Sequence, residues 1–208
     1  MLRMIHVRTK RMQGNAYLLY DDESKEAAIV DADFGAEKLV AQADNLGLRI
    51  CFILLTHGHF DHIGALDMLK RMTGAPVYIG IGDEDMLADN FLNMSFFSEK
   101  PLNRCIPDRL LTGGEKIPLG NSEILVYHTP GHTAGSLCYL ADPYLCSGDT
   151  LFSDAIGATH FPGGNKSDMK ASLRLLAGLP GDLLLLPGHD KSSKLGAAIR
   201  QVSGGFLW

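Results

Sequence analysis

Four side chains of the kind that bind metal ions lie within one short segment of this chain, and that segment constrains the fold most. Residues 56–62 read Thr-His-Gly-His-Phe-Asp-His, which places three imidazoles and one carboxylate in seven positions. The apolar run before it, residues 51–55, predicts a buried strand. After it, apolar residues recur near helical spacing over residues 63–72, and Gly74 is a suitable stop. The cluster is therefore predicted on a strand-to-helix turn.

The spacing within this segment favours two metal ions. His57 and His59 are two residues apart on extended backbone, so both can face the same side. Asp61 and His62 follow at the start of the predicted helix and point in a different direction. Imidazole and carboxylate are suitable ligands for zinc and similar divalent ions. One metal can take the first pair and a second metal the other, whereas the alternative, a histidine-rich surface loop, fits poorly between a buried strand and a helix.

Length and composition narrow the class of protein. The chain has 208 residues, so we expect one domain over residues 1–208, and 46% apolar residues are enough for a sizeable core. A net charge of −5 argues against a protein that holds nucleic acid by neutralising its backbone. No apolar run approaches the 18 or so residues that span a membrane, and residues 1–12 contain no apolar core of a signal peptide.

The four cysteines form no Cys-x-x-Cys pair, and three of them lie in apolar strand-like runs, where free cysteine behaves as a small hydrophobe. We expect them to be reduced and the protein to be cytoplasmic.

Strands and helices are predicted to alternate through the first half of the chain, which indicates a layered α/β architecture. Expected strands cover residues 17–20, 27–30, 51–55 and 76–79 in the first half and 123–128, 137–140, 144–146 and 183–186 in the second; expected helices cover 36–46, 63–72 and 169–177, with a short helix possible after residue 189. Residues 83–110 lack clean periodicity. Their apolar side chains, including Phe91, Met94 and Phe96, fit either a lid over a substrate pocket or a cover over the core.

Three further candidate ligands each follow a predicted strand by a few residues. They are His132, Asp149 and His189, and each is preceded by glycine, which lets backbone come close to a metal. If these strands share a direction in their sheets, the loops emerge at one edge, where layered α/β folds commonly gather their ligands. Each of the three is weak evidence for a metal ligand on its own, but together with the first cluster they make a set of seven candidate ligands.

Four motifs taken together identify a resemblance. Thr-His-x-His-x-Asp-His, Thr-Pro-Gly-His-Thr-x-Gly-Ser, Gly-Asp-Thr-Leu-Phe and Pro-Gly-His, spread over residues 56–189, resemble the metallo-β-lactamase superfamily. Within it the sequence most resembles the glyoxalase II (hydroxyacylglutathione hydrolase)-like branch. The resemblance implies an α/β fold of the four-layer αββα sandwich type, with a dinuclear metal site at one edge of the sheets.

The resemblance also implies a role for each ligand. The first metal would be bound by His57, His59 and His132, and the second by Asp61, His62 and His189, with Asp149 as a bridge between them. A hydroxide would be the other bridge, because two cations about 3.5–4 Å apart lower the pKa of a shared water to near neutrality. This hydroxide would attack a thioester or another small ester, and Asp61 would also orient it. The expected cofactors are two divalent ions, zinc first, with iron or manganese as alternatives.

The sequence departs from this branch in the loop over residues 157–164. Ala158 stands where the branch often has arginine, and His160 where it often has aspartate. His160 fits either a contact to a substrate anion or a surface position. The chain also ends at residue 208 without the helical extension that holds glutathione in the larger enzymes. Both departures leave open whether the small-molecule substrate is a glutathione thioester.

Other activities of the superfamily stay as alternatives. One is a persulfide dioxygenase-like enzyme with a single iron, although all seven ligand positions are filled here; another is a lactonase or related hydrolase. A non-catalytic protein with this fold would need no particular ligands, so the complete ligand set disfavours it. The acidic net charge disfavours a nuclease. The sequence makes no prediction of oligomeric state.

Overall fold

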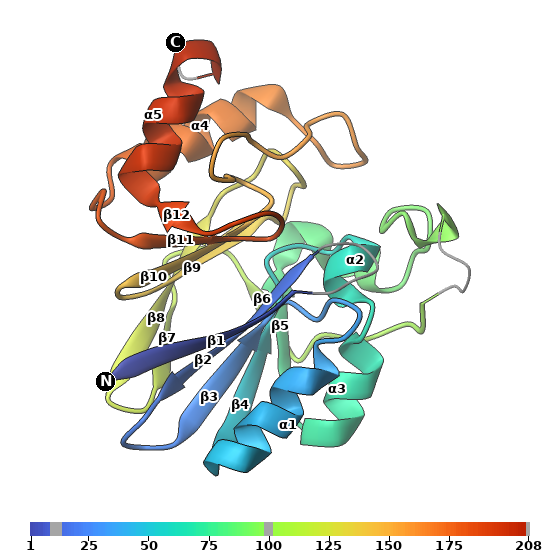
Figure 1. Cartoon of the computed structure of the whole chain (residues 1–208). Coiled ribbons are helices and arrows are strands. Elements are labelled where there is room, and N and C mark those ends of the chain that lie inside the picture. Colours follow the sequence, from blue (N-terminus) through green and yellow to red (C-terminus); the bar gives the residue numbers. More distant parts are fainter. Residues whose placement is uncertain (9–13, 98–101, 207–208) are drawn as a thin grey trace.

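The computed structural model describes residues 1–8, 14–97 and 102–206, and its strands form two mixed sheets (Figure 1). Residues 9–13, 98–101 and 207–208 lie outside the described part, so four residues of the segment 83–110 are not described. The first sheet runs in the order β1 (Leu2–Arg8), β2 (Asn15–Asp21), β3 (Glu26–Val30), β4 (Arg49–Leu54), β5 (Val77–Gly80) and β6 (Arg109–Leu111). The second runs β12 (Ser193–Lys194), β11 (Leu184–Pro187), β10 (Tyr144–Gly148), β9 (Leu137–Ala141), β8 (Ser122–His128) and β7 (Lys116–Leu119).

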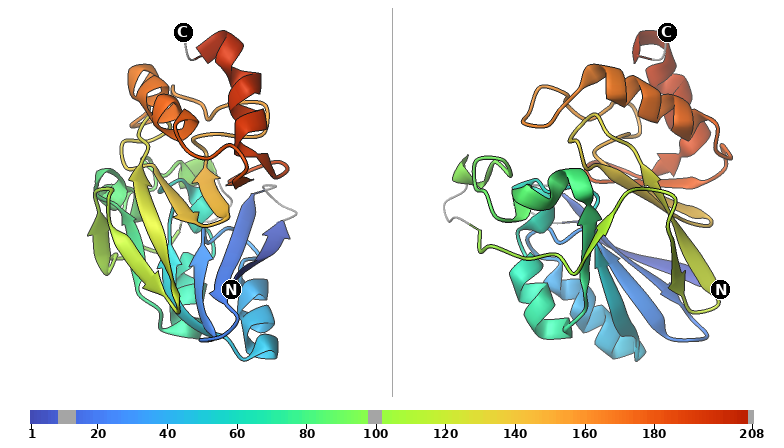
Figure 2. Two further views of the ribbon diagram at one scale, coloured as in Figure 1. Left: turned by 90° about the vertical axis from the view of Figure 1, so that its left-hand side faces the viewer. Right: turned by 180° about the vertical axis from the view of Figure 1, so that it is seen from behind.

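Helices cover the outer face of each sheet, so the layers follow the predicted αββα order (Figures 1 and 2). The first sheet carries α1 (Glu37–Leu46) and α3 (Leu66–Thr73), and the second carries α4 (Lys166–Ala177) and α5 (Leu195–Phe206). Short elements join these layers: α2 (Phe60–Ile63) and the 3₁₀ helices η1 (Ile81–Leu87) and η2 (Ser95–Phe97).

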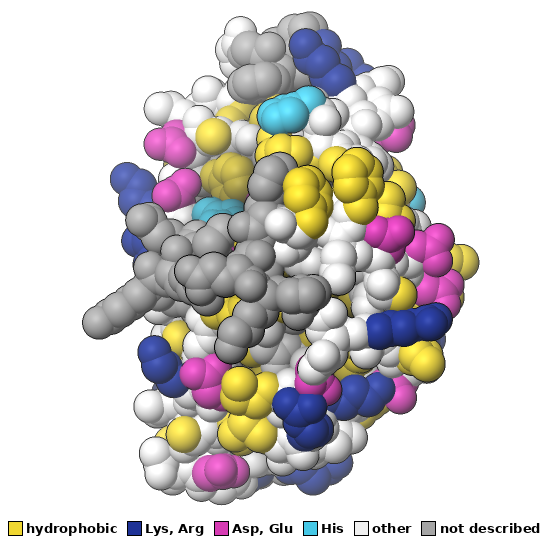
Figure 3. Space-filling view, turned by 90° about the vertical axis from the view of Figure 1, so that its right-hand side faces the viewer, with side chains coloured by type: hydrophobic (Ala, Val, Ile, Leu, Met, Phe, Trp, Pro, Cys, Tyr) yellow, Lys and Arg dark blue, Asp and Glu magenta, His cyan; other side chains and the backbone are white. Residues whose placement is uncertain are grey.

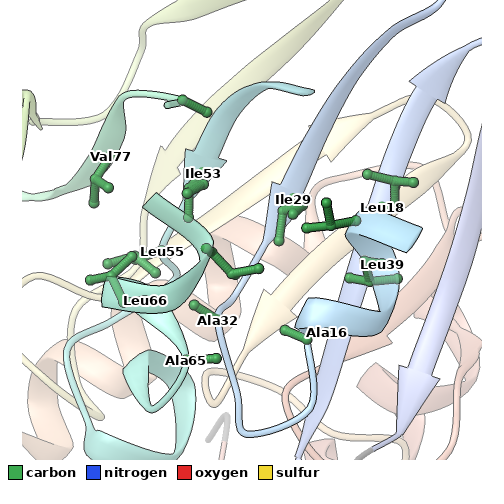
Figure 4. Packing of buried hydrophobic residues seen from close by; sticks show 14 of the residues in the cluster. Ala16, Leu18, Ile29, Ala32, Leu39, Ile53, Leu55, Ala65, Leu66 and Val77 are labelled. Carbon is green, nitrogen blue, oxygen red and sulfur yellow. The ribbon is translucent and has the colours of Figure 1, made fainter. Parts of the chain in front are cut away.

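Three apolar clusters fill the spaces between the four layers. In the first, Leu18 and Ile53 of the sheet pack against Leu39 and Leu66 of the helices (Figure 4). The second lies between the two sheets, and the third lies between the second sheet and helices α4 and α5. Because inner strands are buried on both faces, they appear in the sequence as continuous apolar runs, which is why their positions could be predicted.

Strand direction explains why loops that are far apart in sequence meet at one edge. In the second sheet β8 and β10 are each antiparallel to β9, and β10 is parallel to β11, so β8, β10 and β11 share one direction. In the first sheet β3, β4, β5 and β6 are parallel. The loops that carry His132, Asp149 and His189 therefore leave the second sheet at the same edge, as the sequence predicted.

The strands that the sequence did not predict are edge strands, and the 3₁₀ helices η1 and η2 were not predicted either. The single helix expected over residues 63–72 is divided between α2 and α3. β1 and β7 are half-exposed, β6 has three residues and β12 has two, so none of them has a long apolar run. Helix α4 begins three residues before the predicted start because Asn165 caps it, its side chain accepting from the backbone N–H groups of Ser167 and Asp168.

Two smaller expectations can be compared with the structure. The four cysteines are free thiols. No helix in the described ranges combines the length and apolar character needed to cross a bilayer.

Helix α4 offers a matched test of the outer apolar layer. Leu173 is fully buried between α4 and the second sheet, whereas Leu175, two residues on, is 43% exposed. We expect Leu173→Ala to lower the free energy of unfolding by about 2–5 kcal/mol, because it leaves a cavity, and Leu175→Ala to lower it by less than about 1 kcal/mol. Urea unfolding of the two variants measures the difference; equal losses would contradict this layer assignment.

Asp21, at the end of β2, links the first sheet to the β7–β8 turn of the second. Its buried carboxylate accepts from the backbone N–H of Asn121 at 3.0 Å, and this hydrogen bond is the main cause that lowers the pKa of Asp21 below its ordinary value. Beside it, the N–H of Gly120 donates to Glu26 at 2.9 Å. The turn is therefore held by two side-chain carboxylates of the first sheet.

Acidification should remove the contribution of Asp21. A carboxyl group whose pKa is lower in the folded state stabilises the protein above its unfolded pKa of about 3.9, and that stabilisation is lost as the pH falls through the folded value. The difference in unfolding free energy between wild type and Asp21→Asn should thus be larger at pH 6 than at pH 3. Denaturant titrations at both pH values measure it, and a difference that grows on acidification would show that the sign is wrong.

Candidate metal centre

The seven predicted ligands lie at one edge of the two sheets. His57, His59, Asp61 and His62 follow β4, while the other three follow β8, β10 and β11. Their donor atoms form three overlapping groups in which all atoms lie within 4.8 Å of one another: His57, His59 and His132; His57, His62 and Asp149; and Asp61, His62 and His189.

The separations between donor atoms match those of ligands that share an ion. His59 Nδ1 lies 2.9 Å from His132 Nε2, and His62 Nε2 lies 3.3 Å from His189 Nε2. His189 Nε2 is 3.2 Å from an oxygen of Asp61. Ligand atoms on one tetrahedral zinc are about 3.3 Å apart. Asp149 lies between the two groups, 3.4 Å from His62 Nε2 and 3.7 Å from His132 Nε2.

Several donor atoms in this cluster have no hydrogen-bond partner. They are His57 Nε2 and Asp149 Oδ1, and both are buried; His59 Nε2, the ring nitrogen that does not face His132, is also buried without a partner. A buried polar atom without a partner costs about 1–3 kcal/mol, so a cluster of them needs a ligand. The residues present therefore fit divalent metal ions.

The ionisation of these groups favours the same conclusion. Burial, followed by the neighbouring imidazoles, holds the pKa of His57 well below its ordinary value and lowers the pKa of His59 to about 3. Burial opposes ionisation of Asp149, but the adjacent His62 lowers its pKa below the ordinary range. Imidazoles with free lone pairs beside ionised carboxylates form a site for a cation.

Asp31 orients two of the candidate ligands, His62 directly and His57 through Thr56. Its carboxylate accepts from the Thr56 backbone N–H at 2.8 Å and from Thr56 Oγ1 at 2.9 Å, and it lies 2.9 Å from His62 Nδ1. Thr56 Oγ1 is also 3.2 Å from His57 Nδ1. These contacts keep the proton on each Nδ1 and leave Nε2 free for a metal. Asp31 has φ +63°, a conformation that aspartate and asparagine tolerate better than most residues.

Asp83 joins the loop of the first cluster to the loop of His132. Its fully buried carboxylate accepts from the N–H of Gly58 at 3.0 Å, from Thr133 Oγ1 at 2.7 Å and from the N–H of Gly135 at 2.7 Å. His132 is oriented separately, its Nδ1 lying 2.8 Å from the carbonyl oxygen of Ala158. The relative position of these two loops therefore depends on one carboxylate.

Asn15, on β2, holds both sides of the loop that carries His189. Its Nδ2 donates to the carbonyl oxygens of Pro187 at 2.9 Å and Asp190 at 3.0 Å, and its backbone N–H donates to Gly188 at 2.7 Å. Gly188 is required there, because a Cβ would overlap Asp149 Oδ1. Contacts from the first sheet thus position a ligand supplied by the second.

Sequence reasoning missed these three supporting residues. The position of Asp31 directly after a buried strand, which the ligands share, could have identified it from the sequence. Asn15 and Asp83 had no such signal, because their partners are distant in sequence.

His160 does not enter the metal cluster. Its side chain is exposed, and its ring packs on that of Phe161 at 4.4 Å between centroids. Phe161 instead lines a cavity of about 140 Å³ over the metal ligands, with Phe60 and Met94. His59, Asp61, His132 and Asp149 complete the lining. The predicted contact of His160 with a substrate anion stays a prediction.

Comparison with known proteins agrees with this arrangement. The sequence matches the family model of the metallo-beta-lactamase superfamily over residues 9–189. It is 33% identical over 190 residues to hydroxyacylglutathione hydrolase GloC of Haemophilus influenzae, covering 88% of this chain and 89% of that protein.

Two solved structures are similar over nearly their whole length. BLEG-1 B3 metallo-beta-lactamase has a TM-score of 0.88 and 35% identity, covering 99% of each chain. TTHA1623 in a di-iron-bound form has a TM-score of 0.84 and 31% identity, covering 95% of this chain and 98% of that one.

Asp31→Asn should weaken metal binding without unfolding the chain. Asparagine accepts the φ of this position, but it lacks the charge that orients His62 and, through Thr56, His57. We expect metal affinity to fall about 10–100-fold, as for other groups that orient metal ligands. Competition with a chelator, followed by metal analysis, measures the affinity. Asp44→Asn, an exposed position on α1, is the control; wild-type affinity in Asp31→Asn would contradict the assignment.

Proposed function

Because the chain belongs to the metallo-beta-lactamase superfamily, we propose that it is a hydrolase that uses two divalent metal ions, zinc first, to cleave a small-molecule thioester in the manner of glyoxalase II. Asp149 carries the proposal. Its oxygens lie between the two groups of imidazoles, and Oδ1 is buried without a hydrogen-bond partner. A carboxylate in that position suits a bridge between two ions better than a site with one ion.

The reaction consumes water and yields a carboxylic acid and a thiol. Bound in pairs, divalent ions supply a nucleophile at neutral pH and polarise the substrate carbonyl. The residues that line the cavity include no serine or cysteine, so this chain provides no protein nucleophile there. Asp61, 3.2 Å from His189 Nε2, would accept a hydrogen bond from the attacking water and orient it. A thiolate leaves without strong acid assistance, and the cavity lining offers no group placed as a general acid.

Similar proteins support this choice and suggest a second one. GloC is named as a hydroxyacylglutathione hydrolase, which acts on a thioester. The similarity to BLEG-1, named as a B3 metallo-beta-lactamase, makes a β-lactam the second candidate substrate. Iron is an alternative metal, since TTHA1623 binds two iron ions.

A substrate screen with metal analysis in the same sample tests the proposal. Thioesters, lactones, β-lactams and phosphodiesters should be offered to protein of known metal content. We expect about two metals per chain and thioester hydrolysis as the main activity. One iron per chain with oxygen uptake would contradict the proposal and favour a persulfide dioxygenase-like enzyme.

Asp149→Ala should lose at least about 100-fold in kcat/KM and one or both metals, because the bridging carboxylate is removed. Asp154→Ala is the matched control, since it lies five residues on in the same loop and is exposed. Circular dichroism checks that both variants fold. Full turnover by a folded, metal-free Asp149→Ala protein would exclude the mechanism.

A further inference from the structure

Two phenylalanines are exposed side by side, three residues before and two residues after Met94, which lines the cavity over the candidate ligands. Phe91 is 65% exposed and Phe96 is 52% exposed, and their rings stack with centroids 5.5 Å apart and planes 14° from parallel. The core-cover interpretation of these two residues is therefore wrong. Exposed apolar surface of this kind commonly marks a binding site. Figure 3 shows hydrophobic side chains gathered beside histidines on this face.

The same short segment also contributes to the cavity over the metal ligands. Met94 lies between the two phenylalanines in sequence, lines that cavity, and donates its N–H to the carbonyl of Phe91 at 3.1 Å. The Asn93 carbonyl accepts from the N–H of Phe60 at 2.9 Å, and Asn93 Nδ2 donates to Met86 at 2.7 Å. The phenylalanine pair is thus fixed to the loop that carries the first metal ligands.

Apolar surface continues from this segment to the ligands themselves. The Phe161 ring stands edge-on to His59 at 5.8 Å and to His132 at 6.1 Å. Among the residues that line the cavity, the charged side chains are Asp61 and Asp149, both assigned to the metals, and none is lysine or arginine. Apart from the metal ions, no cation in this lining would bind a carboxylate of the substrate.

The cavity is too small to hold a whole substrate. Its volume is about 140 Å³, whereas pockets for small molecules typically measure about 300–1,000 Å³. The remainder of a substrate whose carbonyl reaches the metals must therefore lie on the surface at the mouth. The segment from Phe91 to Phe96 supplies exposed apolar side chains on either side in sequence of Met94, which lines the cavity.

We propose that Met94, Phe161 and the Phe91–Phe96 pair form a binding surface for the acyl group, so that the substrates are thioesters of apolar, medium-chain or aryl acids rather than of short hydroxy acids. The inference rests on the proposed hydrolase activity and names its substrate class. The apolar chain would run from the scissile carbonyl past Met94 onto the two stacked rings.

An acyl-length series tests this subsite. N-acetylcysteamine thioesters of butanoate, hexanoate and octanoate share one leaving group, so kcat/KM reports the acyl chain alone. We expect kcat/KM to rise roughly two- to fourfold per methylene, the value of burying one CH₂ group. The double variant Phe91→Gln/Phe96→Gln should abolish this rise beyond butanoate while metal content is kept, and Phe91→Leu/Phe96→Leu should restore most of it.

A control variant and a binding measurement test whether the length dependence comes from the phenylalanine pair and whether it exists without turnover. Ile106→Gln removes another exposed apolar side chain that does not line the cavity, and should leave the length dependence unchanged. Calorimetry of octanoate and butanoate binding reports the subsite without turnover; octanoate should bind at least about tenfold tighter to wild type and lose this advantage in the double glutamine variant.

The results that would overturn the inference differ from those that overturn the hydrolase proposal. An equal length dependence in wild type and the double glutamine variant overturns the subsite. So does a change of oligomeric state in that variant with unchanged length dependence, which would assign the pair to a protein interface. A metal-loaded wild type that cleaves no thioester, yet prefers octanoate through the two rings, would contradict the proposed activity and support the subsite.

Discussion

The structure depends on one electrostatic constraint, a buried cluster of carboxylates and imidazoles at the edge of the two sheets. Asp149 is almost fully enclosed and has an oxygen without a hydrogen-bond partner, while burial keeps His57 and His59 neutral. Burial opposes protonation of His62 and His189, but the adjacent carboxylates raise the pKa of both imidazoles, so charged and neutral donor groups are concentrated in one buried space. Such a cluster is unfavourable to fold around unless a metal binds, so folding and metal binding should be thermodynamically linked.

The two-sheet architecture makes that cluster possible. Three loops leave the second sheet at one edge because β8, β10 and β11 share a direction, and β4 delivers the histidine-rich turn from the first sheet. The supporting contacts cross between the sheets: Asn15 of the first holds the loop of His189, and Asp83 joins the turn at Gly58 to the loop of His132. The sheets are therefore coupled through the site as well as through the apolar layer between them.

The sequence was informative wherever the signal was local. The αββα order, most inner strands and the candidate ligands could be predicted, because buried strands are continuous apolar runs and each ligand follows one closely. Edge strands such as β7 could not, since Pro118 and half-exposed positions weaken their pattern. Asn15 and Asp83 hold the loops of the site through partners 25 to 175 residues away, so no spacing rule could single them out. Met94 could not be identified from the sequence either, because its place in the cavity depends on the packing of an irregular segment.

The loop over residues 157–164 orients His132 through its backbone. Ala158 stands where the glyoxalase II-like branch often has arginine, yet its contribution here comes from the backbone, because its carbonyl accepts from His132 Nδ1 at 2.8 Å. Any side chain at that position can keep this contact. Phe161 of the same loop lines the cavity, and its uncharged ring stands edge-on to His59 and His132. The contact that orients His132 therefore depends on a backbone atom of this loop, and a change of side chain at position 158 need not disturb it.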